Sequence, residues 1–82
     1  MRRAARTDNT AANLVKATKQ LGAKYLPLNS VVDGVIQWKD RTILVDWKSK
    51  GGTLTPAQAK LVAEGWRIEF VSTPEQLEDL LR

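Results

Sequence analysis

The chain has 82 residues, of which 43% are hydrophobic and 27% charged, and it carries a formal net charge of +4. This composition is typical of a globular protein, and the length suffices for a single domain, which we expect to span residues 1–82. Since the chain contains no cysteine and no histidine, disulfides, zinc fingers and histidine-based catalysis are excluded, and any metal ion would be bound by oxygen.

The sequence contains neither a transmembrane pattern nor a secretory signal. No apolar run approaches the roughly 20 residues that cross a bilayer. The N-terminal residues MRRAARTDNT lack the apolar stretch of a signal peptide. We therefore expect a cytoplasmic protein that does not contact membranes.

The charge is unevenly distributed along the chain. Residues 1–50 contain ten Lys or Arg and four Asp, a net charge of +6, whereas residues 51–82 contain three basic and five acidic residues, a net charge of −2. A positive field over part of a small protein favours a polyanionic partner, most commonly a nucleic acid. Simple solubility is the alternative explanation of the charge taken alone.

The chain begins with a predicted helix and a short strand. After a basic arm over residues 1–7, which we expect to be flexible, Thr7 or Asp8 can cap a helix that continues with helical spacing of its apolar residues to Gly22. The segment AKYLPL then predicts a short strand, which ends near its proline.

Two longer strands follow and predict a hairpin. They are VVDGVIQW over residues 31–38 and RTILVDWK over residues 41–48, and only Lys39 and Asp40 separate them. A two-residue connection between two apolar runs is typical of a tight β-hairpin. The glycine-containing segment KGGT after the second strand indicates a loop.

The last third of the chain predicts helix, strand and helix. In TPAQ, Thr55 suits the N-cap, proline the first helical position and Gln58 a capping box, and this helix should end near Glu64. WRIEFV predicts a fourth strand, and TPEQLEDLLR repeats the capping pattern before a final helix with its leucines inward. The element order α-β-β-β-α-β-α predicts the α/β (α+β) class.

The hairpin contains charged residues where apolar ones are expected. Side chains alternate between the faces of a strand, so Asp46 and Lys48 share one face. If Lys39 and Asp40 form a symmetric turn, counting outward along both strands brings Asp33 opposite Asp46. Like charges in that position destabilise a sheet. A divalent cation would compensate, because two carboxylates, a backbone carbonyl and waters form the oxygen-rich set that Mg²⁺ prefers.

Each of these residues also has an ordinary structural explanation. Asp33 could begin a strand, Asp46 could pair with Lys48 as an ion pair, and Lys48 could be one more solvated charge. Their occurrence together on one face of an apolar hairpin favours a functional site. In such a site the lysine would stabilise an anionic transition state or help to deprotonate a water.

The segment VDGVIQWKDRTILVDWKSKGGTLTPAQ resembles the PD-(D/E)xK nuclease superfamily, and most closely the small stand-alone VRR-NUC domains of phages and bacteria. The resemblance extends over nearly the whole chain. It implies a restriction-endonuclease-like αβββαβ core with a C-terminal helix, in which helices flank a central mixed sheet. It also implies a metal-dependent endonuclease that hydrolyses phosphodiester bonds, selects branched or Holliday-junction DNA, and uses Mg²⁺ or Mn²⁺.

The same resemblance assigns roles to individual residues of this chain. Asp33 and Asp46 would be metal-binding carboxylates, the backbone carbonyl of Trp47 would be a further ligand, and Lys48 would be the catalytic lysine. Gln58 matches a glutamine that follows the motif in such domains. Its capping-box role is the alternative, since Gln76 repeats the pattern where no active site is expected.

Two positions depart from the family pattern. Val32 stands where the superfamily has proline, and the strand can still place the following aspartate. The first helix of relatives usually supplies an acidic metal ligand, and the corresponding residue here is Asn13. An amide oxygen can ligate a hard cation without adding charge, so Asn13 is either a weaker ligand or an exposed polar residue.

Basic and aromatic residues supply the candidate nucleic-acid contacts. Lysines and arginines would bind the DNA backbone without reading sequence, and the candidates are Arg2, Arg3, Arg6, Lys16, Lys19, Lys39, Arg41 and Lys50. The three tryptophans could stack on bases, although the core or a dimer interface is their more usual place.

A two-fold homodimer is expected because a small single domain has little core and a four-way junction presents paired phosphodiesters. Two other functions remain open: a non-catalytic DNA-binding module on a nuclease-like fold, and an assembly protein whose apolar strands pair with a partner.

Overall fold

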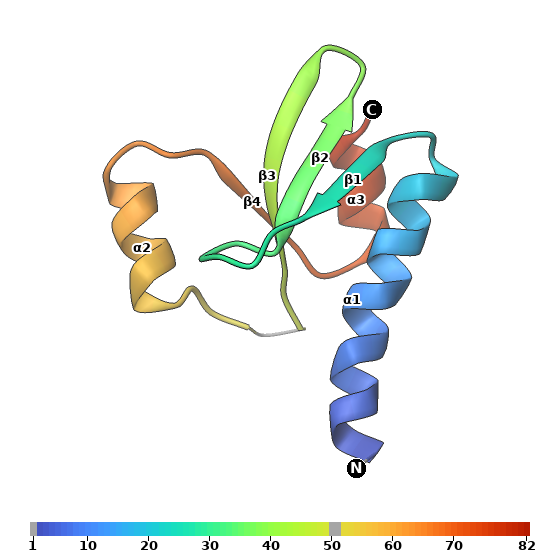
Figure 1. The fold of residues 1–82 in the computed structure, drawn as a ribbon, viewed down its shortest axis with the longest axis horizontal. Coiled ribbons are helices and arrows are strands. Elements are labelled where there is room, and N and C mark those ends of the chain that lie inside the picture. Colours follow the sequence, from blue (N-terminus) through green and yellow to red (C-terminus); the bar gives the residue numbers. More distant parts are fainter. Residues whose placement is uncertain (1, 50–51) are drawn as a thin grey trace.

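The computed structural model describes residues 2–49 and 52–82, and the side chains of residues 11–49 and 52–82. Three helices and a four-stranded mixed sheet form an α+β fold (Figure 1). In chain order the elements are α1 (Arg2–Gln20), β1 (Lys24–Pro27), β2 (Gly34–Trp38), β3 (Arg41–Trp47), α2 (Pro56–Ala63), β4 (Ile68–Val71) and α3 (Pro74–Leu80). The predicted class and order of elements are confirmed.

The strands lie in the order β1-β2-β3-β4, with β1, β2 and β3 antiparallel and β4 parallel to β3. Trp38 pairs with Arg41, which confirms the two-residue turn. Lys39 adopts a φ of 55°, the left-handed conformation that tight hairpin turns require.

Two predicted boundaries were wrong. The strand expected from Val31 begins at Gly34, and residues 29–33 bend. The ladder stops there because the Asp33 N–H donates to the side chain of Asp46 instead of a strand carbonyl. Helix α1 begins at Arg2, so the backbone expected to be a flexible arm over residues 1–7 is helical from there. The segment RRAAR consists of strong helix formers and contains no helix breaker. The helix therefore extends toward the N-terminus past Thr7 and Asp8, the residues that were expected to cap it.

The hydrophobic core lies between one face of the sheet and helices α1 and α3 (Figure 1). Its buried residues include Leu14 of α1, Ile36 and Val45 of the hairpin, and Leu77 of α3. Strand alternation explains why these apolar side chains share the core-facing side of the sheet, because Ile36 and Ile43 pair directly and point the same way. Asp46 therefore points to the opposite face.

The tryptophans divide between the core and the surface. Trp47 is buried and Trp38 is partly buried against the core, as expected for most of them, whereas Trp66 after α2 is exposed. Helix α2 lies on the far side of the sheet from α1 and α3 (Figure 1), and Gln58 is its buried residue. No helix in residues 2–49 and 52–82 combines the length and apolarity needed to cross a membrane.

Candidate active site

Four predicted site residues meet where β3 ends. Asp46 lies in β3, Lys48 directly follows that strand, Asp33 precedes β2, and Gln58 lies in the first turn of α2. Gly34 pairs with Val45, so the next residues outward, Asp33 and Asp46, lie opposite each other as predicted.

The two aspartates hold each other's strands through backbone N–H groups. The Asp33 N–H donates to Asp46 Oδ1 at 3.0 Å, and the Trp47 N–H donates to Asp33 Oδ2 at 2.8 Å. Asp46 thus accepts a hydrogen bond from the backbone of Asp33, and Asp33 accepts one from β3, the strand that carries Asp46. These bonds fix both side chains at the end of the sheet.

Lys48 is held between the acidic pair and helix α2. Its Nζ lies 3.0 Å from Asp46 Oδ2 and donates to Gln58 Oε1 at 2.8 Å. The same Nζ lies 5.6 Å from the centre of the Phe70 ring, within the range of a cation–π interaction. The ammonium group is therefore positioned on three sides and is not a free surface charge.

Gln58 serves the helix cap and the site at once. Its backbone N–H donates to the Thr55 hydroxyl, and its Oε1 accepts from the Thr55 N–H, which completes the capping box. Its Oε1 also accepts from Lys48, and its Nε2 donates to the Val31 carbonyl at 2.9 Å. The two roles considered for Gln58 occur together.

The site is buried on one side and open on the other. Asp46 and Gln58 are only 5% and 2% exposed, the Lys48 side chain is 15% exposed, and Asp33 lies exposed at the rim. Partial desolvation of the Asp33 carboxyl raises its pKa above the ordinary value, and the charge of Asp46 acts in the same direction. The Trp47 N–H and the charge of Lys48 lower the same pKa.

The donor set fits a small, hard cation. The described residues contain no group of three or more His, Cys, Asp or Glu side chains that could hold a metal, so the two aspartates are the charged donors. Mg²⁺ commonly binds one or two carboxylates and keeps waters or substrate phosphates as its other ligands. A cation beside Asp33 and Asp46 would also offset the desolvation, and the charge of Asp46, that raise the pKa of Asp33.

The other two predicted ligands differ in position. Trp47, whose backbone carbonyl is the third predicted ligand, directly follows Asp46 in β3. Asn13 is exposed on α1, and within the described part of the chain no hydrogen bond joins it to either aspartate.

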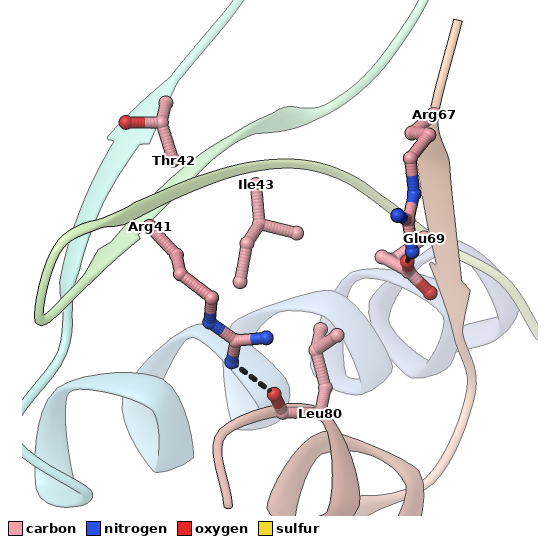
Figure 2. A pocket seen from close by; sticks show the side chains of 6 residues that line it. All are labelled: Arg41, Thr42, Ile43, Arg67, Glu69 and Leu80. Atoms are coloured by element: carbon pink, nitrogen blue, oxygen red, sulfur yellow. Dashed lines mark hydrogen bonds and ion pairs between the residues drawn. The ribbon is translucent and has the colours of Figure 1, made fainter.

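Among the predicted DNA-binding residues, Lys39 and Arg41 lie at the turn end of the hairpin, opposite the end that holds the acidic pair. Lys16, Lys19 and Lys39 are exposed, and Lys39 lies over the Trp38 ring at the hairpin turn. Arg41 begins β3, whereas the acidic pair lies at its other end, and the Arg41 guanidinium donates to the Leu80 carbonyl. Figure 2 shows this arginine beside a cavity of about 310 Å³, which Thr42, Ile43, Arg67, Glu69 and Leu80 also line. Lys50 and the side chains of Arg2, Arg3 and Arg6 lie outside the described residues.

Tyr25 belongs to this region and was not predicted. Its hydroxyl donates to the Asp33 carbonyl and accepts from Trp47 Nε1, each at 3.1 Å. Burial raises the pKa of Tyr25, so its hydroxyl remains a hydrogen-bond donor at neutral pH. The spacing of charged residues could not identify it, because it acts from a neighbouring strand and carries no charge.

Comparisons of the chain with protein-family models, curated proteins and solved structures found no match.

Proposed function

We propose that this chain is a metal-dependent DNA endonuclease that hydrolyses phosphodiester bonds in branched DNA, on a restriction-endonuclease-like core. The observation that carries the proposal is the linked arrangement of Asp33, Asp46 and Lys48 with Gln58, which comes from a separate helix. Two acids and a lysine at the end of a sheet provide a cation site beside a fixed positive charge. That combination suits phosphodiester hydrolysis.

The roles of the residues follow from their contacts. Asp33 and Asp46, with the Trp47 carbonyl, would hold Mg²⁺ or Mn²⁺, which when bound supplies charge stabilisation at the scissile phosphate and activates water. Lys48 has its Nζ fixed by Asp46 and Gln58, so little reorganisation is needed when negative charge develops next to it. Gln58 orients the lysine, and its bond to the Val31 carbonyl fixes α2 against the segment that precedes Asp33.

The DNA specificity and the homodimer belong to the same proposal. Two copies would present two such sites to the paired phosphodiesters of a four-way junction. Apolar side chains away from the core support an additional interface, since Leu26 and Trp66 are 61% and 55% exposed. Light scattering of the chain at tens of micromolar should give the mass of a dimer without DNA. A stable monomer would overturn the dimer.

A DNA-binding module without catalysis is the second candidate. It is favoured by the exposed Asn13, which leaves two carboxylates as the charged donors among the described residues. Such a module would bind branched DNA with a strong salt dependence and would not cut it.

Cleavage assays separate the two candidates. Purified protein should cut four-way-junction DNA faster than forked or linear duplex DNA in Mg²⁺ or Mn²⁺, and EDTA should abolish cleavage. Asp46→Asn serves as the control for a contaminating nuclease, because it changes one side-chain group at the site. DNA binding without metal-dependent cleavage of any of the three substrates would replace the enzyme with the binding module.

A further inference from the structure

Tyr25 connects the acidic pair to the rest of the sheet. It lies in β1 opposite Ile36 and is half-buried on the face that the core covers. Its hydroxyl donates to the backbone carbonyl of Asp33 and accepts from the indole Nε1 of Trp47, and both distances are 3.1 Å. A single oxygen thus links β1, the segment before β2, and β3.

The Tyr25 ring also lies directly against the backbone at Gly34. A Cβ added to Gly34 would overlap the ring and its hydroxyl, so the ring occupies the space of the side chain that glycine lacks. The ring also packs on Trp47, with ring centres 5.7 Å apart and planes inclined by 43°. Glycine directly after Asp33 therefore has a structural reason, which is the close approach of the tyrosine.

Both residues that Tyr25 holds take part in the hydrogen bonds of the acidic pair. Asp33 donates its N–H to Asp46 and accepts from Trp47 through its carboxylate. The Asp33 carbonyl is fixed by the Leu28 N–H at 2.8 Å and by Tyr25. A displacement of this backbone would move the Asp33 carboxylate relative to Asp46.

We propose that Tyr25 is a positioning residue: from the core-covered side of the sheet, it fixes the backbone of Asp33 and the indole of Trp47 and so sets the separation of the two carboxylates. This inference rests on the proposed function for its consequence, because the carboxylate separation determines the affinity for the cation. Residues that orient metal ligands typically change metal affinity by about 10- to 100-fold when they are removed.

The test compares Tyr25→Phe with a matched control. Tyr25→Phe keeps the ring on Gly34 and removes the hydroxyl. Thr42→Val removes another hydroxyl of the same sheet, which donates to Gln37 at 2.6 Å. Thr42 lies near the hairpin turn on the face opposite Tyr25, four residues along β3 from Asp46. Mn²⁺ dissociation constants come from electron paramagnetic resonance of free Mn²⁺, and kcat and KM come from cleavage of junction DNA.

Tyr25→Phe should raise the Mn²⁺ dissociation constant by about 10-fold and lower kcat at limiting Mn²⁺ with KM for DNA unchanged, whereas Thr42→Val should leave all three as in wild type. Hydrogen exchange of the Asp33 and Trp47 amides, measured by NMR without metal, should be faster in Tyr25→Phe only. A folded Tyr25→Phe protein with wild-type Mn²⁺ affinity and wild-type exchange at both amides would overturn the inference.

Gly34→Ala provides a second test from the backbone side, because its methyl group displaces the Tyr25 ring and alters no carboxylate. Mn²⁺ affinity should fall at least as far as in Tyr25→Phe, and wild-type affinity in a folded Gly34→Ala protein would overturn the inference. If wild type itself binds no Mn²⁺, the proposed function fails. The exchange rates of the Asp33 and Trp47 amides then decide the positioning role by themselves.

Discussion

Helices α2 and α3 begin with nearly the same four residues, TPAQ and TPEQ, and are put to different uses. In both, the threonine hydroxyl accepts from the glutamine N–H, and the glutamine Oε1 accepts from the threonine N–H. The local structure is therefore the same capping box, which each sequence predicts correctly.

The two glutamines differ in what lies beyond the cap. Gln76 is exposed, and its Oε1 accepts further hydrogen bonds only from the neighbouring Ser72 within the described residues. Gln58 is 2% exposed and joins Lys48 to the Val31 carbonyl across the end of the sheet. A motif of four residues thus fixes a helix start in both places, while the tertiary fold alone makes one of them part of a site.

The largest expected effect concerns Lys48, whose ammonium group donates a hydrogen bond to Gln58. Lys48→Met should slow cleavage of junction DNA at least about 100-fold, the scale of a group that stabilises transition-state charge. DNA binding should stay within several-fold of wild type, because the interaction acts mainly in the transition state. Single-turnover cleavage and fluorescence anisotropy measure the two quantities.

Lys24→Ala is the matched control for Lys48. Lys24 is exposed and lies on the same face of the sheet, since it pairs with Gln37. At most it contacts phosphate, so its replacement should change binding and cleavage about equally and reduce the log–log salt dependence by about one unit. Equal behaviour of the two lysine variants would remove Lys48 from the chemistry.

Metal binding should depend on the acidic pair beside Gln58 and not on the equivalent cap at Gln76. Mn²⁺ at 100 times its dissociation constant should stabilise the protein by about 2.7 kcal/mol, which is roughly 10–20 °C in Tm for a domain of this size. Gln76→Ala should keep the full increase, and Asp46→Asn should lose it because a charged ligand is gone. A thermal unfolding curve that Mn²⁺ at millimolar concentration leaves unchanged would contradict the metal site.

The two glutamines can be compared directly by truncation. Gln58→Ala should cost about 2 kcal/mol, because Lys48 and the Val31 carbonyl lose partners in a buried place, whereas exposed Gln76→Ala should cost about 0.5 kcal/mol for its cap alone. Urea unfolding measures both free energies. Cleavage at a temperature where both variants are folded should fall only for Gln58→Ala, and equal losses of stability would show that Gln58 is a cap and no more.

The fold was accessible from the sequence where local signals are strong. The threonine-proline starts of α2 and α3 and the two-residue turn at Lys39 and Asp40 are short-range patterns, and each occurs as predicted. The start of β2 could not be read in this way. Its ladder ends at Asp33 because the backbone N–H of that residue bonds to a side chain from another strand, a competition that no local pattern records.

The candidate site divides in the same manner. Asp33 and Asp46 could be brought together from the sequence because strand register and a symmetric turn determine which residues face each other. Lys48 followed from its place on the same strand face as Asp46, whereas the site role of Gln58 was proposed from a resemblance. The hydrogen bond between them depends on how α2 returns to the sheet. Tyr25 could not be found, because its contacts to Asp33 and Trp47 connect β1 with the segment before β2 and with β3 and leave no charge pattern.

The smallest expected effect tests the acidic pair itself. The folded state raises the pKa of Asp33 above its ordinary value of 3.8, mainly by desolvation, so the folded state favours the protonated acid. The stabilisation from this proton is complete below the ordinary pKa and is lost as the pH rises through the raised value.

Asp33→Asn introduces a side chain without charge, so the variant does not lose this stability as the pH rises. The amide oxygen can still accept the hydrogen bond from the Trp47 N–H. In EDTA at pH 7 we therefore expect its Tm to exceed that of wild type by about 2 °C, a shift that corresponds to a few tenths of a kcal/mol for an exposed group. The difference should disappear as the pH falls below 3.8, the ordinary pKa, because the carboxyl is then protonated in both the folded and the unfolded state. Asp46→Asn should instead lower the Tm at pH 7, because buried Asp46 forms the ion pair with Lys48 at 3.0 Å. Differential scanning calorimetry of the three proteins across this pH range measures these Tm differences. An Asp33→Asn protein that is less stable than wild type at pH 7 would contradict the prediction, because the hydrogen bonds to the carboxylate would then contribute more than its desolvation and the repulsion from Asp46 cost.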